Sequence, residues 1–161
     1  MNDWKQRLTQ ELEPVLRERD PRTRIGAYHD MPFAIFVYPP EAEFELREQL
    51  AMLRTRLEQR GKRVTTMSLA ACLDQALEAE GLDPAALAQV ERDSGLGLTI
   101  ETVHAVLSEY QPLDRVVAGH VPTDAEPTRD LVFLTRAGAL FPVYRTSSLL
   151  EQIKGQVSVP T

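Results

Sequence analysis

The chain of 161 residues carries 43% apolar side chains and a net charge of −6, a composition that suits one folded domain and excludes a wholly disordered chain. No apolar run approaches the ~20 residues that cross a bilayer, and the charged start MNDWKQRLTQELEP lacks a signal-peptide core, so we expect a cytoplasmic protein without a membrane segment. The single cysteine, Cys72, fits a reducing compartment, and its apolar neighbours favour core packing over a nucleophile.

The first sixty or so residues predict two helices with a strand between them. Apolar side chains recur at steps of three and four over residues 3–19, which predicts a helix that Pro14 kinks or divides. Residues 20–32 form a connector. The apolar run Phe33–Tyr38 has strand length and no polar alternation, which is typical of a strand covered on both faces in a parallel sheet. A leucine stripe then predicts a helix over residues 41–60.

The remainder of the chain predicts further helices and strands. Strands are expected at residues 62–69, at 131–135 and from 157 onward. Helices are expected at residues 69–80, 83–93, 99–119 and 147–153. The boundaries carry the usual signals, since Asp83-Pro84 starts a helix well and Gly81 and Gly95 end one well.

The strand, helix and strand within residues 33–69 form a βαβ unit, so we predict an α/β fold. The expected architecture is a three-layer, mainly parallel sheet with helices on both faces, as in P-loop NTPases. It comprises one domain, residues 1–161, in which residues 1–30 are an N-terminal helix and connector. A phosphate-binding loop is not expected after the first strand, because Pro39 and Pro40 remove backbone donors and the glutamates that follow repel a phosphate.

The sequence predicts no catalytic or metal-binding set. His29, His104 and His120 lack the paired spacing of metal ligands, so neither a metal nor another cofactor is expected. The neighbours His29-Asp30 give only a weak signal for an acid–base pair. Ser147-Ser148 fits a helix N-cap better than a nucleophile, because the glycines of a nucleophile turn are absent.

A basic stretch ends the helix predicted at residues 41–60. Its five positive charges lie on Arg54, Arg56, Arg60, Lys62 and Arg63. One interpretation is a patch for nucleic-acid phosphates, extended by the arginines at positions 17, 19, 22 and 24. The other is a solvated helix end whose cations complement the helix dipole. Residues 64–161 carry 6 basic and 13 acidic residues and would repel a phosphate backbone, so nucleic-acid binding is kept as the alternative function.

The stretch VFLTRAGALFPVYRTSSLLEQI, residues 132–153, joins a predicted strand to a predicted helix. Gly138 is expected to allow an unusual backbone turn at this junction. In one interpretation, Arg136, Tyr144 and Arg145 bind a carboxylate, a phosphate or a partner surface. In the other, Arg145 pairs with a local acid while Phe141 and Tyr144 pack under the helix. No general base or nucleophile accompanies the arginines, so binding is favoured over catalysis.

Three stretches, Met31–Arg47, Leu53–Val64 and Val132–Arg145, together with the terminal Val159-Pro-Thr, resemble the BrxB family of bacterial BREX (bacteriophage exclusion) defence systems. The resemblance implies a cytoplasmic, non-catalytic component that works beside the phosphatase-like subunit PglZ and other BREX proteins. Members of this family continue beyond Val-Pro-Thr into another apolar strand. The resemblance therefore implies that the last C-terminal strand of the domain is missing or shortened here.

Three hypotheses follow. The first is an adaptor that binds another BREX subunit, with PglZ as the expected partner and Arg136, Tyr144 and Arg145 as the candidate binding residues. The second is a nucleic-acid-binding protein that uses the basic residues of 54–63 and 17–24. The third is an enzyme or nucleotide switch on the same fold, which the prolines and glutamates after the first predicted strand disfavour.

Overall fold

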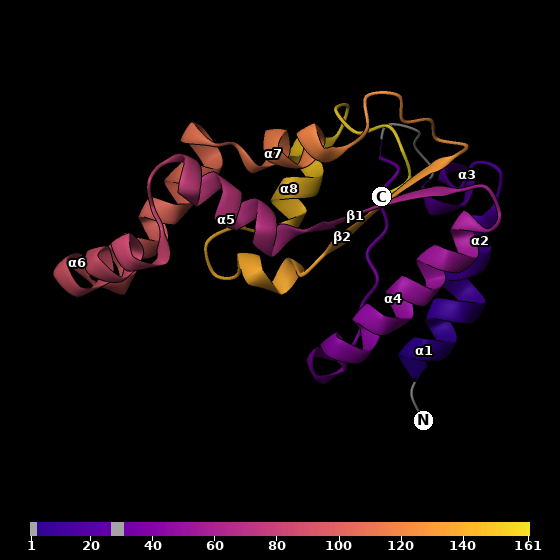
Figure 1. The fold of residues 1–161 in the computed structure, drawn as a ribbon, viewed down its shortest axis with the longest axis horizontal. Coiled ribbons are helices and arrows are strands. Elements are labelled where there is room, and N and C mark those ends of the chain that lie inside the picture. Colours follow the sequence, from indigo (N-terminus) through magenta and orange to yellow (C-terminus); the bar gives the residue numbers. More distant parts are fainter. Residues whose placement is uncertain (1–2, 27–30) are drawn as a thin grey trace. The chain divides into compact units, whose positions relative to one another are not determined.

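The computed structural model describes residues 3–26 and 31–161 (Figure 1). Most of these residues are helical. Within them the sheet consists of two parallel strands, β1 (Arg63–Ser68) and β2 (Asp130–Thr135). The predicted three-layer, mainly parallel sheet with helices on both faces, as in P-loop NTPases, is therefore wrong.

The apolar run Phe33–Tyr38 explains most of this error. It was expected to be buried on both faces, but Ile35 and Val37 are 67% and 64% exposed. Its backbone joins the C-terminal residues through one bridge, in which the Ala34 N–H donates to the Thr161 carbonyl at 2.9 Å and the Thr161 N–H donates to Pro32 at 2.9 Å. Flanking prolines lack the N–H donors that a longer ladder needs.

The predicted last strand, from Val157, is also wrong. Val157 and Val159 are buried, yet the segment reaches the sheet through one backbone bond, from the Val132 N–H to the Pro160 carbonyl at 2.9 Å. An apolar segment that is buried without a hydrogen-bonded ladder thus shows the same sequence pattern as a strand.

The chain divides into two compact units. Unit 1 comprises Met1–Thr65, Thr123–Phe133 and Ser158–Thr161, and unit 2 comprises Thr66–Pro122 and Leu134–Val157. The grouping of residues 1–161 into one domain, with residues 1–30 as an N-terminal helix and connector, stays a prediction.

Unit 1 is built on two long helical segments that pack side by side (Figure 1). The first runs through α1 (Asp3–Arg7), the π-helical turn η1 (Leu8–Leu12) and α2 (Glu13–Arg17), and the second is α4 (Glu43–Glu58). Two short helices, α3 (Arg22–Ile25) and η2 (Pro40–Ala42), complete the unit. The core gathers Trp4, Leu8 and Leu16 from the first segment, Leu46, Leu53 and Leu57 from α4, and Val64 and Leu131 from the strands.

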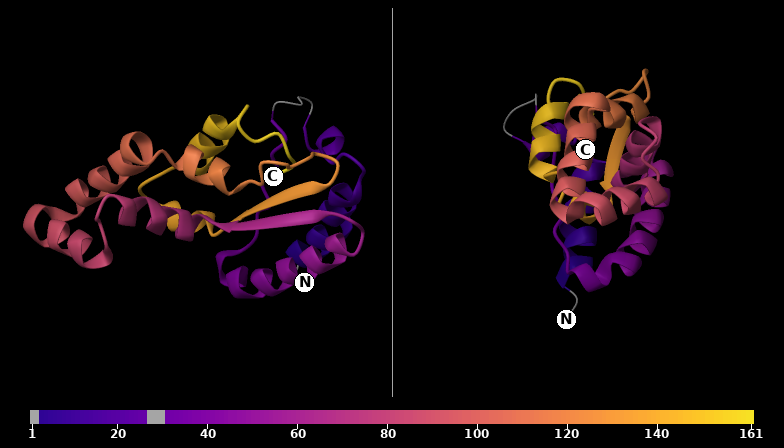
Figure 2. Two further views of the ribbon diagram at one scale, coloured as in Figure 1. Left: turned by 45° about the horizontal axis from the view of Figure 1, so that its top comes forward. Right: turned by 90° about the vertical axis from the view of Figure 1, so that its left-hand side faces the viewer.

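Unit 2 is helical apart from the ends of the strands. Its elements are α5 (Leu69–Ala79), α6 (Pro84–Ala105), η3 (Val106–Tyr110), α7 (Leu113–His120), η4 (Ala137–Leu140) and α8 (Thr146–Ile153) (Figure 2). The helix starts predicted at residues 69 and 83 are confirmed, because Ser68 accepts a bond from the Ala71 N–H and Asp83 accepts one from the Ala86 N–H. The start predicted at residue 99 is wrong, because that residue lies inside α6, and the N-cap of α8 is Arg145 rather than Ser147 or Ser148. Gly95 breaks α6 at a φ of 86°.

The core of unit 2 is made of side chains from each of these helical elements except the first half of α6. Its fully buried members include Leu69, Leu107, Leu113, Leu140, Leu149 and Ile153. Cys72 is buried as expected, and burial raises the pKa of its thiol, so it packs as a small apolar group.

Candidate partner-binding site

The junction between β2 and α8 consists of residues 136–145, all of which belong to unit 2. The strand ends at Thr135, whose hydroxyl donates to the Met67 carbonyl at 3.1 Å. Arg136 then adopts a left-handed conformation, with φ 57° and ψ 40°. The sequence placed the unusual turn at Gly138, but the structure places it at Arg136. A side chain in this region costs roughly 1–2 kcal/mol, and such strain is often kept at functional sites.

Both arginines of the predicted site lie at the surface. Arg136 and Arg145 are exposed, and across residues 3–26 and 31–161 neither side chain makes a hydrogen bond or an ion pair. The interpretation in which Arg145 pairs with a local acid is thus not what the structure shows. Two guanidinium groups are left to solvent or to a ligand.

The two aromatic residues of the junction differ from each other in burial. Tyr144 is 7% exposed, donates its hydroxyl hydrogen to Gln152 Oε1, and lies 6.0 Å from the His104 ring. Burial, followed by the charge of Asp114, raises the pKa of Tyr144. Phe141, in contrast, is 83% exposed. One interpretation of the sequence put Tyr144 in the binding surface, and the other packed both rings under the helix. The second is right for Tyr144 and wrong for Phe141, because an irregular segment has no periodicity that assigns a face.

An open pocket of about 460 Å³ lies beside the junction, within unit 2. Its lining residues are His104, Ser108, Pro142, Val143, Tyr144, Arg145, Ser148 and Gln152. The structure thus brings Tyr144 and Arg145 together, whereas Arg136 is not among the described lining residues. None of the eight lining residues carries a carboxylate. Sequence reasoning treated His104 as an ordinary histidine and did not find the pocket.

His104 is oriented by two neighbours in this pocket. Its Nδ1 lies 2.8 Å from the Val143 carbonyl oxygen, which can only accept, so Nδ1 carries the hydrogen. In the neutral ring Nε2 then accepts from the Ser108 hydroxyl at 3.3 Å. Arg145 therefore supplies the permanent positive charge of the pocket.

The basic residues of the alternative site are mostly engaged within unit 1. Arg54 donates to Glu58 at 2.8 Å, and Arg56 makes a two-pronged contact with buried Glu13 at 2.8 and 3.0 Å. Bonds from Arg56 lower the pKa of Glu13 despite its burial. Arg60 is exposed and without a recorded partner among the described residues.

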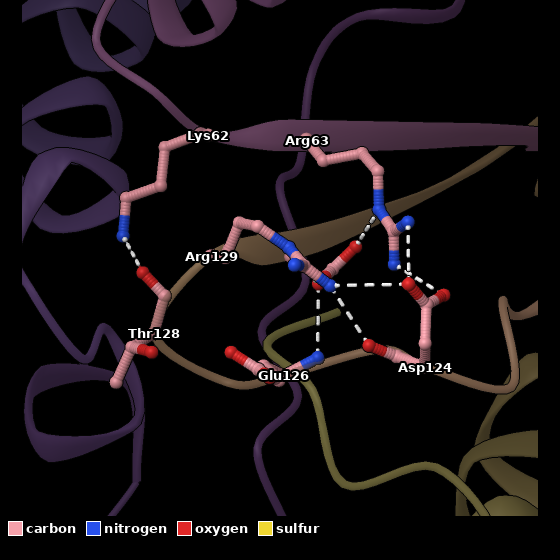
Figure 3. A network of polar contacts seen from close by, with 7 residues as sticks. Lys62, Arg63, Asp124, Glu126, Thr128 and Arg129 are labelled. Atoms are coloured by element: carbon pink, nitrogen blue, oxygen red, sulfur yellow. Dashed lines mark hydrogen bonds and ion pairs between the residues drawn. The ribbon is translucent and has the colours of Figure 1, made fainter.

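Lys62 and Arg63 belong to a polar network at the start of the two strands (Figure 3). Lys62 Nζ donates to the carbonyl oxygens of Glu18 at 2.7 Å and Thr128 at 3.0 Å. Arg63 binds Asp124 at 2.9 Å and also donates to Asp130. These two side chains connect the start of β1 to the segments around Glu18 and residues 124–130. A phosphate would have to compete with these acceptors.

Asp130 is the centre of that network and is 1% exposed. Besides Arg63, its carboxylate accepts from the Arg129 Nε at 3.0 Å and from the Glu126 backbone N–H at 2.9 Å. Burial alone would raise the pKa of Asp130, but the bonds from Arg63, Glu126 and Arg129 together lower it. The carboxylate is therefore charged in the folded protein and joins β1 to the loop before β2.

The arginines at positions 17, 22 and 24 also have acidic partners. Arg17 pairs with Glu13, Arg22 with Asp20 at 2.7 Å, and Arg24 with Glu18 at 3.4 Å. Arg19 is exposed. Three of the four arginines that were predicted to extend the phosphate patch thus form ion pairs with nearby carboxylates.

The remaining sequence predictions concern metals and membranes. His29 and Asp30 lie outside the described residues. In the described part of the chain, no group of three His, Cys, Asp or Glu side chains is placed to hold a metal ion. No helix there has the length and apolar character needed to cross a bilayer.

Comparison with known proteins agrees with the resemblance seen in the sequence. A family model described as BREX protein BrxB matches residues 65–161, a range that includes the junction and the pocket. A protein of Bacillus cereus named BREX protein BrxB is 25% identical over 144 residues, which cover 89% of this chain and 73% of that protein. No solved structure matches the chain.

Proposed function

The chain belongs to the BrxB family of BREX proteins, and from this premise we propose that it is a non-catalytic adaptor that binds another subunit of a BREX phage-defence system. The proposed partner is the phosphatase-like subunit PglZ. The proposed binding site is the junction surface, formed by Arg136, Phe141 and Arg145, with buried Tyr144 as its support.

The observation that carries this proposal is the exposure of Phe141. A phenylalanine that is 83% exposed gains nothing from folding, but it can bury a large apolar area against a partner. In the sequence it lies between Arg136 and Arg145, two exposed arginines without side-chain partners in the described residues. Aromatic residues and arginine are enriched among the side chains that dominate binding energy at protein interfaces.

The nucleic-acid alternative has less support. Arg54, Arg56 and Arg63 are paired with carboxylates, and Lys62 donates to backbone carbonyls. Binding of phosphates by these side chains would cost those contacts, so nucleic-acid binding is not proposed as a second function.

Co-purification of the tagged chain with the other subunits of its BREX system tests the proposal. Wild-type protein should retain at least one subunit, and PglZ is expected. Phe141→Ser should reduce retention by at least tenfold, since residues at the centre of an interface contribute roughly 2 kcal/mol or more. Its melting temperature should stay within one or two degrees of wild type, because an exposed side chain contributes little to stability.

Phe44→Ser is the matched control, because Phe44 is 76% exposed and lies on α4 in unit 1. It should leave retention unchanged. The paired substitution Arg136→Ala with Arg145→Ala should also weaken retention, whereas Arg60→Ala with Arg115→Ala should not. Retention of no subunit by the wild-type chain would reject the adaptor function. Loss of retention with Phe44→Ser alone would move the docking surface to unit 1.

A further inference from the structure

We propose that the pocket lined by His104, Ser108, Arg145 and Ser148 binds the carboxylate of an aspartate or glutamate on the partner subunit. This inference rests on the proposed adaptor function and specifies the chemistry of the partner's contact. It adds a recessed polar site to the exposed apolar contact at Phe141.

The charge of the pocket favours an anion. Its lining contains one arginine and one histidine, and none of the eight lining side chains is acidic. Arg145 offers five N–H donors and has no side-chain partner among the described residues. A guanidinium fork matches a carboxylate in shape and charge, and the pair can form two parallel hydrogen bonds.

Among the other polar side chains of the lining, Ser148 supplies a further donor, whereas the hydrogens of His104 Nδ1 and the Ser108 hydroxyl are already engaged. Ser148 offers a hydroxyl from the first turn of α8, where the helix dipole also favours negative charge. The Ser108 hydroxyl lies 3.3 Å from His104 Nε2, and His104 is itself fixed through the Val143 carbonyl. The pocket therefore combines the Ser148 hydroxyl and the exposed guanidinium of Arg145 with an oriented His104–Ser108 pair.

The surroundings of the pocket favour a protein side chain over a polyanion. Residues 64–161 carry 6 basic and 13 acidic residues, a balance that repels a nucleic-acid backbone at long range. A single carboxylate can pair directly with Arg145, and that contact has to outweigh the charge of Asp114, which raises the pKa of the lining residue Tyr144. Pro142 lines the pocket and directly follows exposed Phe141, so one partner surface can reach both the pocket and the aromatic ring. An acidic residue beside an apolar one on the partner fits both contacts.

Nuclear magnetic resonance of the isolated, ¹⁵N-labelled chain tests the pocket directly. The probes are N-acetyl-glutamate α-amide, its neutral isostere N-acetyl-glutamine α-amide, and inorganic phosphate. The glutamate probe should shift the amide signals of residues 104–108 and 141–148. The glutamine probe should leave them unchanged. Equal shifts with both amides would overturn the carboxylate assignment, and so would stronger shifts with phosphate.

Substitution at Arg145 completes the test. Arg145→Gln should abolish the shifts caused by the glutamate probe, whereas Arg115→Gln, at an exposed arginine of α7, should preserve them. Persistence of the shifts in Arg145→Gln would overturn the inference. Both variants should fold, which unperturbed signals of unit 2 away from the substituted residue would verify.

The partner measurement separates failure of this inference from failure of the adaptor function. Arg145→Gln should lower the affinity for the retained subunit by at least tenfold, and Arg115→Gln should not. If a subunit is retained with unchanged affinity by Arg145→Gln, the inference is wrong and the adaptor function stands. If no subunit is retained although the glutamate probe binds, the adaptor function is wrong and so is the assignment of the pocket to a BREX partner.

Discussion

Removal of the Asp130 carboxylate should destabilise unit 1 severely. Asp130 is 1% exposed at the start of β2, and its oxygens accept from Arg63, from Arg129 and from the Glu126 backbone N–H. In Asp130→Ala, the Glu126 backbone N–H and two guanidinium groups lose an acceptor that lies in the protein interior. Figure 3 shows how closely the labelled arginines converge on this loop.

The expected loss in the free energy of unfolding is about 3 kcal/mol. Breaking a buried ion pair by removing one partner typically costs 3–5 kcal/mol. The lower end applies here, because the side chains of Arg63 and Arg129 are 39% and 38% exposed and water can replace part of the lost contact. Asp130→Asn keeps the shape and one acceptor for the Glu126 N–H, so it should lose only about half as much.

Urea unfolding followed by tryptophan fluorescence measures this loss. Trp4 is the sole tryptophan and lies in the core of unit 1, so its emission reports the unit that holds the network. A loss below about 1 kcal/mol for Asp130→Ala would show that the network adds little to stability. The reasoning would also be refuted if the alanine variant were more stable than the asparagine variant.

Three further predictions use urea unfolding, the first two followed by Trp4 fluorescence and the third by far-ultraviolet circular dichroism, which also reports the helices of unit 2. The folded-state pKa values of Glu13 and Asp130 are lowered from their usual 4.5 and 3.8. The stability that these carboxylates contribute is therefore fully present above pH 4.5 and is lost as the pH falls below it. A urea midpoint that stayed constant down to pH 3 would contradict this prediction. Arg56→Ala should cost about 2 kcal/mol because it removes the contact with buried Glu13, whereas Arg60→Ala should stay within about 0.5 kcal/mol, and equal effects would argue against a structural role for Arg56. Arg136→Gly should be more stable than Arg136→Ala by about 1 kcal/mol because glycine tolerates φ 57°, and equal stability would show that the left-handed turn is not maintained.

The helices could be predicted because their signals are local. Apolar residues at helical spacing, a cap such as Asp83, and a positive-φ glycine such as Gly95 act over a few residues. The predicted helix at 99–119 is interrupted at Gln111 and Pro112, where the proline follows a residue in a non-helical conformation. Boundaries of this kind depend on one or two backbone angles.

The sheet could not be predicted in the same way, because strand pairing is not local. Phe33–Tyr38 has strand composition, but its backbone pairing depends on Thr161 at the far end of the chain. Its alternate residues Ile35 and Val37 face solvent, which an apolar run does not reveal. The continuous apolar run thus predicted a segment buried on both faces, whereas in the structure only the face with Phe36 and Tyr38 packs against the core.

The candidate sites show the same division between local and distant information. Arg56 and Arg63 could be recognised as basic, but their acids Glu13 and Asp130 lie 43 and 67 residues away in sequence. In the segment Phe141-Pro-Val-Tyr144, composition alone does not decide which aromatic ring enters the core. The arginines of the junction were found because they directly follow a strand and directly precede a helix.

The affinity of purified PglZ for the Phe141→Ser chain, measured by isothermal titration calorimetry beside wild type and Phe44→Ser, tests the adaptor function at the junction surface most directly. The account predicts that PglZ binds the wild-type and Phe44→Ser chains with equal affinity and binds the folded Phe141→Ser chain at least tenfold more weakly. Equal affinity of PglZ for all three chains would contradict the account and would place any contact with PglZ away from the junction surface.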